Sequence, residues 1–376
     1  MNFLPQSPHN RLAVDVLIIG LGPAGGSAML AAASKGLNVV AVERKSVIGK
    51  PVQCAEFIPV PISPYCTAPD IISQSVSGMI TTLPSGAKAN AAMQGLIINR
   101  ACFDESLVTR SLAQGASYYM DSHLLSVNTS QRIALVKTPL GLQQIQYQFI
   151  IAADGPCSRV AKLMGLPALE VIKTQQYTVP LIKPLTDTYV WLSKALPGGY
   201  AWLFPKQDKA HVGVGAVGGC HLKYQLQRLH EQLTVQGFVS ANVVARTGGK
   251  IPVSGIRSTL VKDRVLFVGD AAGLTHPITG AGIASAVASG DMAGNAVADA
   301  LHSGDETPLM DYAEEVQELY GPAYSRALLK RRYLLQQLQQ NIQREPQESL
   351  FRSSWIGFKS YYQCGGQPLM SSGGME

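Results

Sequence analysis

The chain has 376 residues, of which 46% are hydrophobic and only 15% are charged, and its 36 glycines imply many tight turns. These values exclude a disordered chain and predict a globular fold with a large core, most simply organised as two joined domains. The formal net charge of +6 is small for this length, which argues against a nucleic-acid-binding protein.

The N-terminus and the cysteines bear on localisation. The first ten residues lack the basic and apolar regions of a signal peptide, and the apolar run from Leu12 to Gly22 is too short to cross a bilayer. The six cysteines show neither a C-x-x-C pair nor a metal-like spacing. We therefore expect a cytoplasmic protein with reduced thiols, no bound metal and no transmembrane segment.

The first predicted unit is a βαβ motif that binds a nucleotide. A buried strand from Asp15 leads into the glycine turn GLGPAG at 20–25, a helix of small residues follows at about 24–35, and a second strand ends at Glu43. In this context a G-x-G-x-x-G turn lets the backbone approach a pyrophosphate at the helix N-terminus. Glu43 is placed to accept hydrogen bonds from ribose hydroxyls and would repel a 2′-phosphate, which favours FAD or NAD over NADP.

Strands and helices are expected to alternate along the rest of the chain. In order they are a strand-like stretch at 71–98, a helix at about 99–115, short strands at 117–153, a strand-rich stretch at 169–219, an amphipathic helix at 221–233, a strand from 264, a long helix from about 282, and a mainly helical C-terminal part with a flexible end. A second G-x-G-x-x-G at 213–218 follows no long apolar strand and precedes a polar helix, so we interpret it as an ordinary strand and turn.

Two later motifs favour a flavin. Asp270 ends a predicted strand, and the turn Gly280-Ala281-Gly282 precedes the long helix that starts near Ile283. The carboxylate can accept from a ribityl hydroxyl, and the helix N-terminus would direct N–H groups and a partial positive charge at the pyrimidine side of a flavin. A further acid and glycine, Asp154 and Gly155, follow the apolar run FIIAA.

Together these three motifs resemble the p-hydroxybenzoate hydroxylase type of FAD-dependent oxidoreductase over about the first 300 residues. The resemblance implies an α/β fold in which a Rossmann-like FAD-binding domain carries an inserted antiparallel-sheet substrate domain of the α+β kind and a C-terminal helical segment. The expected FAD-binding domain is discontinuous, at 1–70, 98–168 and 247–305. The expected substrate domain comprises 71–97 and 169–246, and the helical segment and tail comprise 306–376.

The same resemblance implies the cofactor contacts. They are Gly20, Gly22, Pro23, Ala24, Gly25, Glu43, Arg44, Cys54, Ala55, Arg100, Leu124, Asp154, Gly155, Asp270, Gly280, Gly282 and Ile283. Arg100 would reach the phosphates, although an arginine at a helix start can equally be a surface residue. No histidine or cysteine occupies a covalent attachment motif, so the FAD is expected to be non-covalent.

The loop GKPVQCAEFIP at 49–59 and the segments GYAWLFP at 199–205 and GGKIP at 248–252 are similar to geranylgeranyl reductase-like members of this superfamily. They place a flavin-side loop after the second strand. The candidate catalytic residues are Cys54, Glu56, Tyr200, Trp202 and His276. Each also has a structural alternative, since a free cysteine is often a small buried hydrophobe, alternating aromatics often pack in a core and a lone loop histidine is often structural.

Two more specific resemblances imply different functions. The variant VQCAEFIP and the aromatic end WIGFKSYY at 355–362 are similar to the flavoproteins that mature cysteine tryptophylquinone-dependent oxidases. This similarity implies a monooxygenase that hydroxylates a tryptophan of a partner precursor protein and uses an external reductant for FAD. The rivals are a geranylgeranyl reductase-like enzyme that reduces prenyl-lipid double bonds and a non-catalytic flavin-binding maturation chaperone.

A basic C-terminal segment supplies a possible partner surface. Seven basic and two acidic residues lie between Arg326 and Lys359, a local balance of +5. Such a run is commonly the solvated face of a helix, but it can also steer an acidic partner. Arg331 and Arg332 are the expected centre of that surface.

Overall fold

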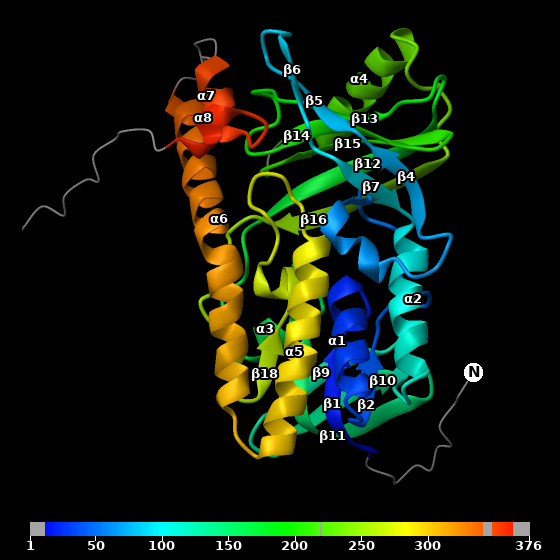
Figure 1. Cartoon of the computed structure of the whole chain (residues 1–376), viewed down its shortest axis with the longest axis vertical. Helices are drawn as coiled ribbons and strands as arrows, with labels where there is room; N and C mark the ends of the chain where they lie inside the picture. Colours follow the sequence, from blue (N-terminus) through cyan, green and yellow to red (C-terminus); the bar gives the residue numbers. More distant parts are fainter. Residues whose placement is uncertain (1–11, 219, 341–347, 364–376) are drawn as a thin grey trace, which may run out of the picture.

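The computed structural model describes residues 12–218, 220–340 and 348–363. An eight-stranded sheet forms the lower half of the molecule in Figure 1. Its strands are β1 (Leu12–Ile19), β2 (Val39–Val42), β8 (Ser117–Tyr119), β9 (His123–Asn128), β10 (Ile133–Thr138), β11 (Gly141–Ala152), β17 (Val261–Lys262) and β18 (Val265–Phe267). The central order β18-β11-β1-β2-β8 is parallel throughout, as expected for strands covered on both faces.

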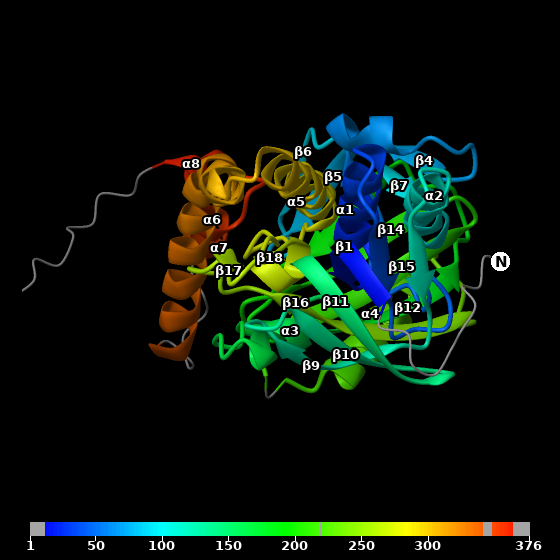
Figure 2. The ribbon, with the colours of Figure 1, turned by 90° about the horizontal axis from the view of Figure 1, so that it is seen from below.

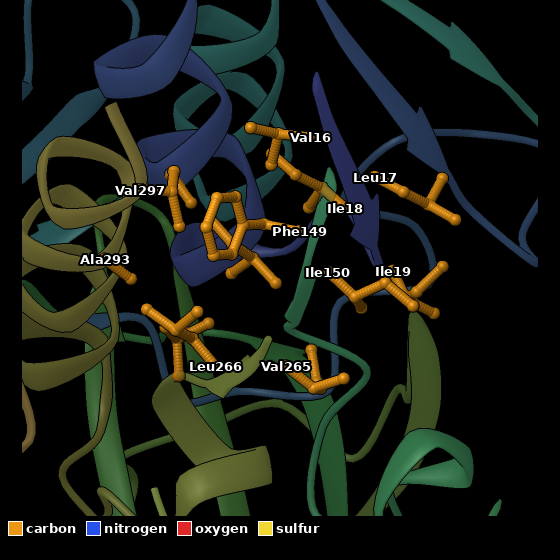
Figure 3. Close-up of a cluster of buried hydrophobic side chains, with 14 of the residues drawn as sticks. Val16, Leu17, Ile18, Ile19, Phe149, Ile150, Val265, Leu266, Ala293 and Val297 are labelled. Atoms are coloured by element: carbon orange, nitrogen blue, oxygen red, sulfur yellow. The ribbon is translucent and has the colours of Figure 1, made fainter. Parts of the chain in front are cut away.

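Three helices, α1 (Pro23–Ser34), α2 (Arg100–Leu112) and α5 (Ile283–Ser303), lie side by side on one face of this sheet (Figure 2). The central strands are apolar along most of their length, so they are buried and form the main core. Figure 3 shows Ala293 and Val297 of α5 beside the core side chains of β11 and β18. Burial of these apolar side chains is the main force that holds the helices on the sheet.

Helices α1 and α5 approach closely because small residues line their contact. A Cβ atom on Gly290 would lie 2.2 Å from the carbonyl oxygen of Ala24, and one on Gly294 would lie 2.6 Å from that of Ala28. The Ser27 hydroxyl also donates a 2.8 Å hydrogen bond across the contact to the carbonyl of Val287. The glycine turn at the start of α1 is therefore fixed against the start of α5.

A seven-stranded sheet forms the upper half of the molecule (Figure 1). In spatial order its strands are β16 (Ala245–Pro252), β12 (Val171–Pro180), β15 (Lys209–Ala216), β14 (Tyr200–Lys206), β13 (Asp187–Trp191), β5 (Gly78–Thr82) and β6 (Lys88–Ala91). All neighbouring pairs are antiparallel except β13 with β5. Helix α4 (Leu222–Val235) packs on this sheet through its leucines.

The remaining elements join these two halves or extend them. They are a three-stranded sheet of β3 (Phe57–Pro59), β7 (Gly95–Ile98) and β4 (Ile72–Val76), the 3-10 turns η1 (Val60–Tyr65) and η2 (Gly269–Ala272), and the helices α3 (Arg159–Leu163), α6 (Thr307–Gln340), α7 (Glu348–Ser354) and α8 (Lys359–Tyr362). Helix α6 runs along α5 and continues up to the second sheet, where α7 and α8 lie (Figure 1). None of the described helices is both long and apolar enough to span a bilayer.

The predicted fold class is confirmed: a parallel, Rossmann-like α/β unit is combined with a mainly antiparallel sheet and a helical C-terminal segment. The second glycine motif, at 213–218, begins inside β15 and is an ordinary strand and turn, also as predicted. The domain boundaries stay a prediction. The predicted end of the chain beyond 363 lies outside the described residues.

The contact between α1 and α5 generates a test. We expect Gly290→Ala to lower the free energy of unfolding by about 1–3 kcal/mol, because the new methyl group would overlap the Ala24 carbonyl. Gly321→Ala in α6 is the matched control, since its nearest neighbour would be Gln317 Oε1 at 3.4 Å and alanine favours a helix by about 1 kcal/mol. Chemical denaturation measures both. Equal effects of the two changes would contradict this account of the helix contact.

Candidate flavin site

A cavity of about 1790 Å³ opens where β1 and β11 end and extends between α4 and β16. This volume exceeds the roughly 300–1,000 Å³ of common ligand pockets, so a dinucleotide has room. The predicted cofactor residues that line it are Gly20, Gly22, Glu43, Arg44, Arg100, Leu124, Asp154, Gly155 and Asp270. Those that do not line it are Pro23, Ala24, Gly25, Cys54, Ala55, Gly280, Gly282 and Ile283.

The glycine turn has the geometry of a phosphate cradle. Gly20 has a φ of +99°, and a Cβ there would lie 2.5 Å from the Ala153 carbonyl oxygen, while one on Gly25 would lie 1.8 Å from that of Gly20. A Cβ on Gly22, by contrast, would meet nothing within 4 Å, because this residue faces the open cavity. Gly22 is the N-cap of α1, so the free N–H groups of the first helical turn point to a space that suits an anion.

Glu43 stands at the end of β2, where the sequence predicts a ribose acceptor. Its Oε2 accepts a 2.7 Å hydrogen bond from the Leu21 N–H, and its Oε1 accepts one of 2.9 Å from the Lys45 N–H. The carboxylate is therefore fixed beside the glycine turn while it lines the cavity. A carboxylate oxygen can accept more than one hydrogen bond, so capacity for ligand hydroxyls remains.

Asp154 presents an unpaired acceptor. Its Oδ2 accepts from the N–H groups of Arg159 at 2.6 Å and Val160 at 3.0 Å, whereas Oδ1 is buried and has no hydrogen-bond partner among the described residues. Burial raises the pKa of Asp154, although these hydrogen bonds act to lower it. A buried acceptor without a partner is costly, so a ligand hydroxyl that donates to Oδ1 would remove that cost. Arg159 also donates to the carbonyl of Leu124, so that backbone group already has a partner.

Asp270 lies in η2, directly beneath the N-terminus of α5. Its Oδ1 accepts a 2.5 Å hydrogen bond from the Thr275 hydroxyl, and burial raises its pKa. A Cβ on Gly282, the N-cap of α5, would lie 2.9 Å from Thr275 Oγ1 and 3.2 Å from Asp270 Oδ1. Only glycine leaves the carboxylate and the helix N-terminus this close together, which is the arrangement that the sequence predicts for the ribityl chain and ring.

The flavin-side loop is held by a chain of buried polar groups. Trp202 Nε1 donates to Gln176 Oε1 at 3.2 Å, which directs the Gln176 amide nitrogen toward the Cys54 carbonyl at 3.1 Å and His211 Nδ1 at 3.2 Å. Because Nδ1 is an acceptor in this network, Nε2 carries the hydrogen and donates to Glu56 Oε2 at 2.6 Å. The Cys54 loop is thereby tied to β12, β14 and β15 of the second sheet.

Glu56 is the centre of this chain. It is 1% exposed and has a left-handed φ of 66°, which is unusual for a residue other than glycine. Besides His211, its carboxylate pairs with Lys206 Nζ and accepts a 2.8 Å hydrogen bond from the Arg100 N–H at the start of α2. Burial acts to raise the pKa of Glu56, but the hydrogen bond from His211 and the charge and hydrogen bond of Lys206 outweigh it, so the pKa is lowered.

Arg100 and Cys54 contact each other next to this network. Arg100 forms a bidentate pair with Asp104, with Nε to Oδ1 at 3.1 Å and Nη2 to Oδ2 at 2.9 Å, and it also contacts the Cys54 thiol. Burial raises the pKa of Cys54, against the opposing effect of Arg100, so the thiol is protonated at neutral pH. With a side chain that is 16% exposed, Arg100 is a largely buried residue of the cavity wall and not the surface arginine of the alternative interpretation.

The aromatic candidates pack together as the sequence predicts for one face of a strand. The rings of Tyr200 and Trp202 are 5.7 Å apart, and Trp355 lies 5.0 Å from Tyr200 on the other side. The Tyr200 hydroxyl donates to the carbonyl of Thr279, and burial raises its pKa. Tyr200 therefore connects the second sheet to the turn that precedes α5.

His276 lies in that same turn but has a structural role there. Its Nδ1 accepts from the N–H groups of Ile278 at 3.4 Å and Thr279 at 3.3 Å, and its ring packs against Tyr324. Burial lowers the pKa of His276 to about 4, so the ring is neutral at neutral pH. A neutral ring of this kind is a poor proton donor, and the predicted catalytic role is not favoured by the geometry.

Within the described chain, the wall of the large cavity does not include the five candidate catalytic residues. Cys54 and Glu56 lie instead in the loop before β3, Tyr200 and Trp202 lie in β14, and His276 lies in the turn before α5. The sequence did not identify Gln176, Lys206 and His211, because their partners lie far away along the chain. Only the proximity of Lys206 to the GYAWLFP motif could have drawn attention to it.

Comparisons with known proteins agree with this geometry. The family model of pyridine nucleotide-disulphide oxidoreductases matches residues 14–236, and that of lycopene cyclase proteins matches residues 221–353. A digeranylgeranylglycerophospholipid reductase of Methanopyrus kandleri is 34% identical over 309 residues, which cover 77% of this chain and 82% of the relative. The chain belongs to the geranylgeranyl reductase-like family of FAD-dependent oxidoreductases.

Solved structures show the same fold. A geranylgeranyl bacteriochlorophyll reductase-like protein from Thermoplasma acidophilum superposes with a TM-score of 0.81 at 24% identity and covers 92% of both chains. Aklavinone-11 hydroxylase, solved with FAD and aklavinone, gives a TM-score of 0.67 at 18% identity over 87% of this chain and 69% of that chain. The family match confirms the predicted oxidoreductase class and, with it, the FAD cofactor, whereas monooxygenase activity stays a prediction.

The residues of this geranylgeranyl reductase-like protein fit FAD. The open side of Gly22 and the N-terminus of α1 suit the pyrophosphate, Glu43 and the unpaired Oδ1 of Asp154 suit hydroxyl groups, and Asp270 suits the ribityl chain. The individual contacts stay predictions.

Asp270 offers a test of this assignment. We expect Asp270→Asn to weaken FAD binding about tenfold or more, since a buried hydroxyl would lose its charged acceptor at a cost of about 1–3 kcal/mol. Asp299→Asn, on the exposed side of α5, is the control. Titration of apoprotein with FAD gives both dissociation constants. Unchanged affinity in Asp270→Asn would contradict the assignment.

Glu56 offers a test of the polar network. Glu56→Gln leaves Lys206 and His211 without their carboxylate, and we expect the free energy of unfolding at neutral pH to fall by about 3 kcal/mol. Because the pKa of Glu56 is lowered in the folded protein, its contribution is complete above the ordinary glutamate pKa of about 4.3 and is lost as the pH falls further. The difference from wild type should therefore shrink below about pH 4.

The control for this variant is Glu306→Gln, whose carboxylate pairs with Arg264 while 55% exposed. We expect a loss below about 1 kcal/mol there. Denaturation curves over a series of pH values measure both variants. A difference between wild type and Glu56→Gln that grows toward acidic pH would contradict the lowered pKa.

Proposed function

We propose that this flavoprotein reduces carbon–carbon double bonds of an isoprenoid substrate. The observation that carries the proposal is the 34% identity to a digeranylgeranylglycerophospholipid reductase over 77% of the chain, together with a protonated thiol that contacts Arg100 of the cavity wall. When bound and reduced, FAD supplies a hydride for such a reaction. The second hydrogen must then arrive as a proton, and the chain has to provide it.

Cys54 is suited to hold that proton. Burial keeps its Sγ protonated, and the neighbouring Arg100 can stabilise the thiolate that remains after donation. The Glu56 N–H also donates to Sγ at 3.2 Å, so Glu56 in the loop and Arg100 in α2 together present two donors to a developing negative charge. Glu56 is already ionised and committed to His211 and Lys206, which makes it a positioning residue for the loop and a poor acid.

The aromatic cluster of Tyr200, Trp202 and Trp355 supports a dry reaction site. These rings pack edge to face and are mostly buried, with their polar atoms hydrogen-bonded inside the protein. Exclusion of water favours hydride transfer and suits an apolar substrate.

A second candidate function is hydroxylation of a tryptophan in a partner precursor protein during tryptophylquinone maturation. The observation that favours it is the polar outer wall of the large cavity, to which α4 and β16 contribute Lys223, Glu231 and Arg246. Such a wall suits a polar macromolecular substrate better than a hydrocarbon chain. This reaction consumes O₂ and an external reductant. The third alternative, a chaperone that carries FAD without turnover, predicts no reaction of either kind.

Oxygen dependence distinguishes these functions. We expect enzyme with reduced FAD, mixed anaerobically with a geranylgeranylated glycerophospholipid, to recover the visible absorbance of oxidised flavin and to yield saturated chains. Cys54→Ala should slow this recovery by about 10²-fold or more, because the proton donor is lost. Cys54→Ser, which retains a weaker donor, is the matched variant.

Two outcomes would overturn the reductase proposal. The first is a flavin that stays reduced without O₂ but is reoxidised when O₂ and a tryptophan-containing precursor are added, with oxygen incorporated into the indole. The second is a flavin that reacts productively with neither substrate, which would support the chaperone alternative.

A further inference from the structure

A small cavity beneath α6 contains a buried cation that has no counter-charge among the described residues. The cavity measures about 30 Å³ and lies between α6, α7 and the segment that precedes β14. Apolar side chains, among them Ile278, Leu334, Phe351 and Trp355, form most of its wall. Two polar residues of this wall, Arg331 and Ser354, carry buried side-chain atoms without a hydrogen-bond partner among the described residues.

Arg331 is 4% exposed and only partly satisfied. Its Nη1 donates to the carbonyls of Gly198 and Pro277. Its Nε and Nη2 are buried and have no hydrogen-bond partner among the described residues, and the same is true of Ser354 Oγ. All these atoms belong to residues that line the same cavity. This placement also corrects the expectation that Arg331 is part of an exposed basic surface, because it lies on the inner face of α6 whereas Arg332 is exposed.

Within the part of the chain that the structure describes, the charge of this guanidinium has no close compensation. The one acid found to influence it electrostatically is Glu170, which is exposed and makes no ion pair with it within the described chain. Arginine stays protonated even when buried. An uncompensated buried charge is strongly destabilising, and carbonyl groups satisfy its hydrogens without neutralising it. Water could complete the hydrogen bonds of the cavity, but only an anion would also neutralise the charge.

We propose that this cavity is an anion-binding site that holds a halide-sized monoanion between Arg331 Nε and Nη2 and Ser354 Oγ. The size follows from the volume: about 30 Å³ accommodates roughly two water-sized bodies, which suits chloride and is too small for a phosphate or a lipid headgroup. The donors are charged and neutral N–H and O–H groups, the chemistry that a halide requires. The apolar wall strengthens the attraction, because it lowers the local dielectric constant.

The anion would fasten the C-terminal helices to the flavin-side turn. Arg331 bridges α6 to Gly198, two residues before Tyr200, and to Pro277, which follows His276. Ser354 and Trp355 continue this contact from the end of α7 onto Tyr200. Occupancy of the site therefore stabilises the packing of α6 and α7 behind the aromatic cluster.

The test compares sodium chloride with sodium gluconate at equal ionic strength, using FAD-loaded protein. We expect chloride to raise the Tm by about 2–4 °C with saturation, whereas gluconate is too large to enter. Arg331→Met should abolish the chloride dependence, and Ser354→Ala should shift saturation to higher chloride. Arg332→Met, the exposed neighbour, should retain the wild-type dependence. Glu345→Gln, outside the described residues, should also retain it.

Crystals grown with sodium bromide keep the proposal testable if Arg331→Met does not fold. We expect an anomalous bromide peak beside Arg331 Nη2 in wild type and a weaker one in Ser354→Ala. Equal Tm values in the two salts, an unchanged chloride dependence in Arg331→Met, or water without anomalous signal at this position would overturn the proposal. So would a chloride dependence that appears only in Glu345→Gln, since Glu345 would then be the counter-charge.

Discussion

The buried carboxylate of Glu56 is the interaction on which the arrangement of the site depends. It accepts the N–H of Arg100 at the start of α2 and pairs with His211 and Lys206 on neighbouring strands of the second sheet. A buried charge tolerates little displacement of its partners, because its desolvation is compensated only while they stay in place. The left-handed backbone at Glu56 and the position of Cys54 two residues earlier follow from this requirement.

The packing of α1 against α5 is a second constraint on the site. The close approach of α1 and α5 brings the glycine turn at 20–25 next to η2 and the N-terminus of α5. The glycine turn lines the large cavity, and the N-cap of α5 lies close to Asp270, which lines the same cavity. Helix α6 adds a third fastening through Arg331, so the turn that carries His276 and Thr279 is held from the sheet side by Tyr200 and from the helix side by Arg331.

The sequence was sufficient to predict those parts of the site whose residues lie close together along the chain. The glycine turn, Glu43, the Asp154 motif and Asp270 are short patterns whose spacing alone predicts a nucleotide site, and the structure gathers them around one cavity. It was insufficient where partners come from distant segments: Glu56 is 150 or more residues from Lys206 and His211, and no spacing rule links them. Arg331 was misinterpreted for the same reason, since a basic run does not reveal which of its members faces inward.

The most direct measurement is a double-mutant cycle between Glu56→Gln and His211→Phe, with the free energy of unfolding of wild type, both single variants and the double variant determined by denaturation at neutral pH. A buried hydrogen bond from His211 to the Glu56 carboxylate that holds the loop predicts a coupling free energy of about 1–3 kcal/mol. Additivity of the two changes within about 0.5 kcal/mol would show that Glu56 and His211 act independently and would contradict the account.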